Sequence, residues 1–218
     1  MNLLTPLQQK VLNAFFSVPD LKKQFYLTGG TALSAFFLKH RLSDDLDFFT
    51  HAVSIESVER LIEDVWTGAG LHVTKERSSP SYRRYRINRE LQVDVVKDVD
   101  FRVGSPELQQ NFMVDNLKNI AVNKVLAIYG RLDAKDYVDL YFLKPVLKFN
   151  ILNLLDLARQ KDKGLENFQW AKIIADVDTF TVLPRLVEPL SLDKLKTFFH
   201  TLRDELIDAM GSSLDIRH

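Results

Sequence analysis

The stretch from Phe25 to Phe49 constrains the fold of this chain more than any other part of the sequence. It opens with a short apolar run, Phe25–Leu27, which predicts a strand, and Gly29 and Gly30 follow closely. A glycine pair at this place predicts a tight turn in which the backbone comes close to a neighbouring group. The next residues predict a helix that Thr31 can cap. Its apolar face would be built from Leu33, Phe36 and Phe37.

Two aspartates, Asp45 and Asp47, stand in the strand predicted to close this stretch. Because side chains alternate across a strand, both carboxylates point to one face, while Leu46 and Phe48 point into the core. Two carboxylates side by side repel each other unless a cation lies between them, and hard oxygen ligands suit Mg²⁺. The alternative is that the aspartates only solubilise or cap a strand end and that the glycine pair is only a turn. Together, a glycine turn opening a helix and a carboxylate pair favour nucleotide chemistry.

A third aspartate, Asp94, lies in the second strand of a predicted hairpin. The strands are residues 82–87 and 91–96, and residues 88–90 form the turn between them. Asp94 points away from the apolar face of its strand, where aspartate is disfavoured. If this strand lies beside the one with Asp45 and Asp47, the three carboxylates form one cluster. The alternative is an edge-strand aspartate that faces solvent.

Residues 75–89 form the most basic segment of the chain. Two tyrosines, Tyr82 and Tyr85, are interleaved with the basic residues, and Glu76 is the single acid of this segment. Such a pattern is a candidate for contacts with the phosphates and bases of RNA. The alternative is an ordinary solvated hairpin. The basic residues are Lys75, Arg77, Arg83, Arg84, Arg86 and Arg89.

From residue 116 onward the pattern predicts helices. Asp115 can cap a helix over residues 116–129, and Lys124 falls within or beside its apolar stripe. A lysine at such a position is costly unless it meets an anion. The next helix is predicted to begin near Asp133, to carry Asp136 and Asp139 one turn apart on one face, and to break at Pro145. A simple salt bridge between Lys124 and Asp139 is the alternative to a catalytic role.

Two groups of these residues resemble one known family. The first comprises Gly29-Gly30-Thr31-Ala32-Leu33, His40-Arg41-x-Ser43 and Asp45-Leu46-Asp47-Phe48-Phe49, and the second is Lys124-x-x-Ala127-x-x-x-Arg131-x-x-x-Lys135-Asp136-x-x-Asp139-Leu140. They are similar to the signature of the nucleotidyltransferase family of AbiEii/AbiGii toxins, within the DNA polymerase beta-like nucleotidyltransferase superfamily. The resemblance is strongest over residues 25–143.

This resemblance implies a Mg²⁺-dependent enzyme that transfers a nucleotide from a nucleoside triphosphate to an acceptor. It implies Asp45, Asp47 and Asp94 as metal ligands, and Lys124 and Asp139 as further catalytic residues, with Lys124 also binding nucleotide. Gly29, Gly30 and Thr31 would bind the triphosphate. The acceptor would be a tRNA, reached through the basic hairpin of residues 75–89. The protein would be the toxin of a toxin–antitoxin (abortive infection) system, with a separate antitoxin protein as partner.

Three other functions compete with this one. An Asp-x-Asp pair also occurs in aspartate-nucleophile phosphatases, but there a strongly apolar strand leads into the first aspartate, and here the polar residues 39–44 precede it. Metal-dependent glycosyltransferases share the pair too, yet that function leaves Gly29 and Gly30 unexplained. The third alternative is a catalytically inactive interaction module with the same fold. The presence of all three carboxylates argues against it, because like charges have no reason to stay together at a decayed site.

Composition sets the remaining limits. The 218 residues contain 29 Lys and Arg against 29 Asp and Glu, so no global charge draws the chain to nucleic acid or to a membrane. Cysteine is absent, which excludes disulfides and thiolate zinc sites and is compatible with the cytoplasm. No apolar run approaches the length of a membrane span, so we expect a soluble cytoplasmic protein. The expected fold is α+β, with a nucleotidyltransferase lobe over residues 1–114 that contains a small mixed sheet flanked by helices. A helical lobe over residues 115–218 would pack against it in one compact unit.

Overall fold

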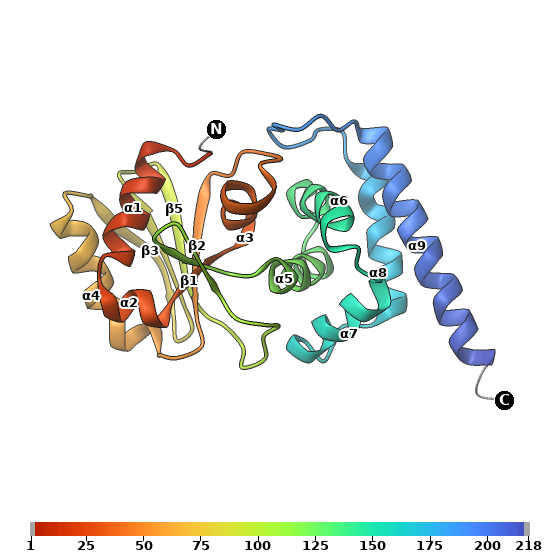
Figure 1. Ribbon diagram of the computed structural model, residues 1–218, viewed down its shortest axis with the longest axis horizontal. Coiled ribbons are helices and arrows are strands. Elements are labelled where there is room, and N and C mark those ends of the chain that lie inside the picture. Colours follow the sequence, from red (N-terminus) through yellow and green to blue (C-terminus); the bar gives the residue numbers. More distant parts are fainter. Residues whose placement is uncertain (1–2, 216–218) are drawn as a thin grey trace. The chain divides into compact units, whose positions relative to one another are not determined.

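The computed structural model describes residues 3–215 of the chain, with side chains up to residue 211. The chain divides into two compact units, of which the first ends at Asn116 and the second begins at Leu117. The first unit holds a sheet with flanking helices, and the elements of the second are helices (Figure 1). The predicted α+β fold with a mixed sheet is therefore confirmed. Among the described residues, no helix combines the length and the hydrophobicity needed to cross a membrane.

The sheet of the first unit has seven strands in the order β3-β4-β5-β2-β1-β7-β6. β2 runs parallel to β5 and β1 runs parallel to β7, while the other neighbours are antiparallel. The strands are β1 (Tyr26–Thr28), β2 (Asp45–Thr50), β3 (Val73–Ser79), β4 (Tyr82–Ile87), β5 (Leu91–Lys97), β6 (Glu107–Gln109) and β7 (Phe112–Val114). The helices are α1 (Pro6–Phe16), α2 (Pro19–Gln24), α3 (Gly29–Ala32), the π-helical turn η1 (Leu33–Leu38) and α4 (Ile55–Gly68).

Helices α1, α2 and α4 cover one face of this sheet (Figure 1). Local capping fixes where they begin: Thr5 and Gln8 form a reciprocal capping box at α1, and the Ser54 hydroxyl accepts a hydrogen bond from the Ser57 N–H at α4. The buried faces meet in a cluster of aromatic rings, with Phe15 stacked on Phe48 at 4.1 Å between ring centroids. Trp66 and Tyr85 extend the same cluster across the sheet.

The hairpin between β4 and β5 has the register that the sequence predicts. Asn88 and Arg89 both have positive φ angles, 51° and 63°, so the chain reverses tightly between Ile87 and Leu91. Turns with two positive φ angles match the right-handed twist of the flanking strands. The alternation along β4 and β5 consequently places Asp94 on the face of the sheet opposite α1 and α4, together with Asp45 and Asp47. We call this side of the sheet the carboxylate face.

Two local predictions are wrong. Thr31 does not cap its helix, because α3 begins two residues earlier at Gly29, and the Thr31 hydroxyl donates instead to the backbone carbonyl of Asp45. Pro145 does not break α6 (Ala134–Leu147), which continues for two residues beyond it. In the last turn a proline removes only one helical hydrogen bond, and the helix ends where Lys148 adopts a left-handed conformation.

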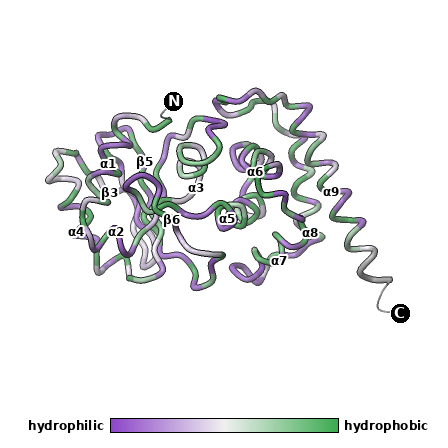
Figure 2. The backbone as a smooth tube through the Cα atoms, in the orientation of Figure 1, coloured by the Kyte–Doolittle hydropathy of each residue, from purple (hydrophilic) through white to green (hydrophobic). Residues whose placement is uncertain are grey.

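The helices of the second unit contribute apolar side chains to a common core. Hydrophobic and hydrophilic residues are interspersed along their backbones (Figure 2). The Trp170 indole N–H donates to the Val125 carbonyl at 3.1 Å, and the Tyr137 ring packs against Phe180 and Phe199. The remaining helices are α5 (Leu117–Gly130), α7 (Ile151–Lys161), α8 (Asn167–Ile173), the 3₁₀ turn η2 (Ile174–Thr179) and α9 (Leu192–Asp215).

An ion cluster ties α4 to the edge of the sheet. Glu59 of α4 binds the buried Arg83 of β4 at 2.8 Å and Lys75 of β3 at 2.6 Å. The hydrogen bond from Arg83 lowers the pKa of Glu59 from 4.5 to about 2; burial opposes this shift and Lys75 adds to it. Two of the six basic residues of segment 75–89 are thus engaged in holding the fold.

Replacing Glu59 tests this cluster. Because the folded pKa lies below the unfolded one, the unfolded chain binds more protons at acid pH, so the contribution of Glu59 is complete above about pH 4.5 and falls as the pH drops towards 2. Glu59→Gln should lower the free energy of unfolding at pH 7 by about 1.5–3 kcal/mol, the usual range for hydrogen bonds to a charged group. Urea unfolding at several pH values measures this difference. A difference that stays constant between pH 7 and pH 3 would contradict the assignment.

Candidate active site

Four side chains form a row across the carboxylate face of the sheet. Thr28 on β1 pairs in register with Asp47 on β2, Asp47 pairs with Asp94 on β5, and Asp94 pairs with Arg84 on β4. Side chains of residues directly opposite each other on neighbouring strands lie on the same face. Asp45 lies two residues before Asp47 on β2, opposite Gln92 on β5. β5 therefore lies beside β2, which is the condition under which the sequence places the three carboxylates on one face.

The backbone of the glycine turn after β1 lies directly against the Asp47 carboxylate and the Arg41 guanidinium. Gly29 has a φ of +73°, and a Cβ atom on it would clash with Oδ2 of Asp47 and lie 3.0 Å from its Cγ. A Cβ on Gly30 would clash in the same way with the guanidinium of Arg41, a residue only 2% exposed. Glycine is required here both for the backbone conformation and for the close approach. The turn thus brings its backbone into contact with Asp47 and a buried cation.

The loop before β2 fixes Asp45. The Ser43 hydroxyl donates to Oδ1 of Asp45 at 3.2 Å, and the Gln8 side-chain amide donates to the Ser43 carbonyl at 2.9 Å. The Thr31 hydroxyl donates to the Asp45 carbonyl from the other side. Thr31, expected to contact the triphosphate, is buried and uses its hydroxyl to hold the strand that carries the aspartates.

Asp94 accepts hydrogen bonds from three side chains. Arg84 donates to it twice, from Nε to Oδ1 and from Nη2 to Oδ2, both at 2.8 Å. The Tyr82 hydroxyl donates to Oδ1 at 3.0 Å and the Gln92 amide to Oδ2 at 3.3 Å. Burial, followed by the charge of Asp94, raises the pKa of Tyr82 to about 12, so its hydroxyl stays a donor at neutral pH. Asp94 stands where the sequence predicts it, but its carboxylate is bound to Arg84.

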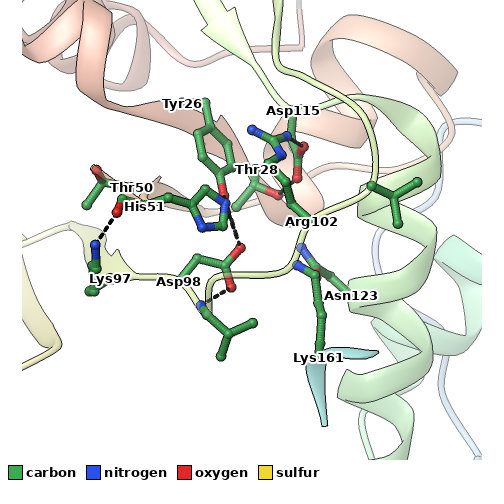
Figure 3. A network of polar contacts seen from close by, with 12 residues as sticks. Tyr26, Thr28, Thr50, His51, Lys97, Asp98, Arg102, Asp115, Asn123 and Lys161 are labelled. Carbon is green, nitrogen blue, oxygen red and sulfur yellow. Dashed lines mark hydrogen bonds and ion pairs between the residues drawn. The ribbon is translucent and has the colours of Figure 1, made fainter. Parts of the chain in front are cut away.

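A buried polar network at the end of β1 escaped the sequence analysis (Figure 3). The Tyr26 hydroxyl contacts Nε2 of His51 at 2.9 Å and donates to Oδ2 of Asp98 at 3.0 Å. Next to it, the fully buried Asp115 accepts hydrogen bonds from the Thr28 hydroxyl at 2.8 Å and from Arg102 at 2.6 Å. Asp115 also accepts from the adjacent Asn116 N–H. The next helix begins at Leu117, so Asp115 lies one residue before the N-cap position and not at it as predicted, and its main contacts fasten the end of β1 just before the glycine turn.

The donor atoms of Asp45 and Asp47 suit a divalent cation. Both are carboxylates on one face of one strand, two residues apart, and hard oxygen ligands of this kind are those that Mg²⁺ takes. Over residues 3–215 no group of three or more His, Cys, Asp or Glu side chains is arranged to hold a metal ion. The aspartate pair fits such an ion, whereas a third contact from Asp94 requires at least one of the four hydrogen bonds that its carboxylate accepts to open.

In the second unit, Lys124 lies between two fully buried aspartates of α6. Its Nζ is 2.8 Å from Oδ1 of Asp136 and 2.6 Å from Oδ2 of Asp139, and Arg131 binds Asp136 from the other side at 2.8 Å. Burial by itself would raise the pKa of Asp136, but the charges of Lys124 and Arg131 outweigh it and hold that pKa below its usual value. The contact between Lys124 and Asp139 is as predicted. The second contact, with Asp136, is consistent with its position on the same helix face as Asp139. A catalytic role for Lys124 and Asp139 stays a prediction.

Comparison with known proteins identifies the family. A family model described as the nucleotidyl transferase AbiEii toxin of type IV toxin–antitoxin systems matches residues 10–210. The chain belongs to the AbiEii family. A protein of Aquifex aeolicus, aq_aa25, whose function is uncharacterised, is 29% identical over 152 residues that cover 65% of this chain and 68% of the relative.

Solved structures share the fold of this AbiEii family member. JHP933 from Helicobacter pylori is 18% identical, with a TM-score of 0.59 and coverage of 97% of this chain and 95% of that one. MenT4, the nucleotidyltransferase toxin Rv2826c of Mycobacterium tuberculosis, is 16% identical, with a TM-score of 0.53 and coverage of 93% and 82%. At these identities the similarity concerns the fold alone.

The basic hairpin of this AbiEii protein is largely neutralised by its own acids. Lys75 and Arg83 bind Glu59, and Arg84 binds Asp94. Arg86 binds Glu76 through two hydrogen bonds of 2.9 and 3.0 Å. These contacts favour the solvated, salt-bridged alternative for much of the segment, and binding of tRNA through residues 75–89 stays a prediction.

The glycine turn can be tested by adding a single methyl group. In Gly29→Ala the left-handed backbone alone should cost about 1–2 kcal/mol, and the methyl group must displace the Asp47 carboxylate. Gly68→Ala is the control: its Cβ would meet nothing within 4 Å at the end of α4, so stability should be unchanged or slightly higher. Denaturant unfolding of both variants measures the difference. Equal stability of the two would show that Gly29 is not under this constraint.

Removing the Lys124 ammonium should destabilise the second unit. Lys124→Met keeps the aliphatic stem but takes a cation from two aspartates with no solvent exposure, a change that typically costs about 3–5 kcal/mol. The control is Lys135→Met on the exposed side of α6, which should change stability by less than about 0.5 kcal/mol. Thermal unfolding followed by circular dichroism compares the two variants. If Lys124→Met melts with the wild type, the buried ion cluster contributes no stability.

Proposed function

We propose that this AbiEii protein transfers a nucleotide from a nucleoside triphosphate to a hydroxyl group of an RNA acceptor, with Mg²⁺ as the cofactor. The observation that carries the proposal is the contact between the Gly29 turn and Asp47, with Asp45 and Asp94 on the same face of the sheet. Nucleotidyl transfer needs a backbone that approaches phosphates closely and a carboxylate pair that holds a metal next to them. Membership of a nucleotidyltransferase toxin family supports the same chemistry.

Each residue of the site in the first unit would have a separate role in the transfer. Asp45 and Asp47 would hold Mg²⁺, which supplies charge stabilisation at the α-phosphate and favours the deprotonated acceptor hydroxyl. The backbone N–H groups of Gly29 and Gly30 would bind the triphosphate, and the buried Arg41 guanidinium would add positive charge behind them. The acceptor hydroxyl gives up its proton to solvent, and its oxygen forms a bond to the α-phosphorus. The bond between that phosphorus and the oxygen bridging it to the β-phosphorus breaks, and pyrophosphate leaves with this oxygen.

We further propose the biological setting that the family implies. The acceptor would be the 3′ end of a tRNA, and the protein would act as the toxin of a toxin–antitoxin pair whose antitoxin is a separate protein. Both substrates are found in the cytoplasm, where we place the reaction. An inactive interaction module with the same fold is disfavoured because it would gain nothing from carboxylates on adjacent strands.

A labelling experiment tests the chemistry. Purified protein is incubated with each α-labelled nucleoside triphosphate, Mg²⁺ and total RNA, and incorporation into RNA or protein is measured. We expect label in RNA with the wild type and a loss of roughly a hundredfold or more with Asp45→Asn or Asp47→Asn, the scale for losing an essential electrostatic group. Asp44→Asn, an exposed neighbour outside the strand, is the control and should label normally.

The outcomes separate the candidate functions. Label in protein instead of RNA would move the acceptor to another class, and no label with any nucleotide would favour the inactive module. Both strand variants should unfold cooperatively, because relief of like-charge repulsion does not destabilise a fold. Full activity in both variants would contradict the metal-binding assignment of the pair.

A further inference from the structure

The state of Asp94 separates it from the other two aspartates on this face. Its side chain is 11% exposed and accepts four hydrogen bonds, two of them from Arg84 in a bidentate, charge-assisted arrangement. Tyr82 and Gln92 supply the other two. A carboxylate has about four acceptor sites in total. Binding a metal through Asp94 would therefore require at least one of these contacts to open.

The same contacts hold Arg84 in a fixed position. Arg84 and Asp94 are directly opposite each other on β4 and β5, and the pair is planar and bidentate, which orients the guanidinium as a rigid fork. The guanidinium also lies 5.7 Å from the centre of the Tyr82 ring. Of the five N–H donors of an arginine, Asp94 takes two. The remaining donors belong to a side chain that is 25% exposed on the carboxylate face.

The position of Arg84 in the row relates it to the aspartate pair. It stands two strands away from Asp47, and neighbouring strands are about 4.8 Å apart. A substrate with several phosphates that meets a metal at Asp45 and Asp47 extends over distances of this size. Arginine is the side chain best suited to bind phosphate oxygens through two parallel N–H groups.

We propose that Arg84 is a phosphate-binding residue of the site and that Asp94 is a positioning residue that holds Arg84, not a metal ligand. The proposal rests on the proposed function for the nature of the substrate. Its ligand is a phosphate group, which belongs either to the nucleoside triphosphate or to the backbone of the RNA acceptor. Asp94 then acts on the substrate only through Arg84.

The chain offers a matched control on the same strand. Arg86 lies two residues from Arg84 on the same face of β4 and is held by Glu76 in a similar bidentate pair. It lies opposite Gln92, which is opposite Asp45, so Arg86 belongs to the next row on this face and does not share the row with Asp94 and Asp47. Arg86→Gln therefore removes an equivalent charge and salt bridge one row away from Arg84 and leaves the pair of Arg84 and Asp94 intact.

The first experiment measures metal affinity with Mn²⁺ as the probe, from the signal of free Mn²⁺ in electron paramagnetic resonance. Asp94→Asn should bind Mn²⁺ within about twofold of the wild type, whereas Asp47→Asn should bind it at least about tenfold more weakly, since tenfold corresponds to the loss of one moderate contact. If Asp94→Asn loses as much affinity as Asp47→Asn, Asp94 is a ligand and the proposal fails.

The second experiment measures phosphate binding in EDTA, with tripolyphosphate and a single-stranded oligoribonucleotide as separate probes. Arg84→Gln should weaken one of them about tenfold relative to Arg86→Gln, and the probe affected tells whether the triphosphate or the RNA backbone is the ligand. Asp94→Asn should weaken the same probe, and the double variant should be no worse than Arg84→Gln alone, because residues that act through one contact are not additive.

Equal effects of Arg84→Gln and Arg86→Gln on both probes would overturn the proposal, and so would an additive double variant. Circular dichroism melting confirms that each variant is folded before binding is measured. Neither experiment depends on turnover. A failure of nucleotide transfer would therefore refute the proposed function while the binding data still decide the role of Arg84.

Discussion

Like-charge repulsion among the carboxylates of β2 and β5 is the constraint on which the first unit depends. Asp47 and Asp94 are directly opposite each other on neighbouring strands, an arrangement in which like charges are destabilising. The fold offsets this repulsion at Asp94 with Arg84, and the Gly29 turn brings backbone against Asp47. Carboxylates gathered on one face of the free protein are best accounted for by a cation and an anionic substrate that use them.

The second unit also brings carboxylates together, and there they are neutralised by cationic side chains that contact them directly. Asp136 and Asp139 have no exposed side-chain surface, and Lys124 and Arg131 bring two positive charges to them. Only 8% of the Lys124 side chain is exposed, against 25% for Arg84. A buried cation held by two carboxylates must give up strong contacts before it can bind a ligand, whereas Arg84 keeps donors available on an accessible face. The two groups therefore differ in how firmly the cation is held, and a catalytic role for Lys124 stays a prediction.

Local patterns in the sequence were sufficient for most of the first unit. Capping at Thr5 and Ser54 and the alternation of Asp45 and Asp47 depend on residues close in sequence, so they could be predicted. The partner of Asp94 could also have been derived, since closing the hairpin with Ile87 opposite Leu91 places Arg84 opposite Asp94. The network of Tyr26, His51 and Asp98 could not, because it joins residues 25 and 72 positions apart that only the folded sheet brings together. Strands β6 and β7 were not predicted because three residues are too short for a periodic signal, whereas the equally short β1 is marked by the glycine pair that follows it.

The two adjacent arginines of β4 show how one strand can serve stability and binding separately. Alternation sends Arg83 to the face covered by α4, where it is 7% exposed and binds Glu59, and sends Arg84 to the carboxylate face. A cross-strand pair of opposite charges contributes only about 0.2–1 kcal/mol. Asp94 also brings a like charge opposite Asp47, so stability alone does not explain an aspartate at this position. Removing both Arg84 and Asp94 would lower the repulsion at β2. The sheet would then lack a fixed guanidinium beside the aspartate pair. Binding of a phosphate group accounts for that guanidinium, whereas packing does not.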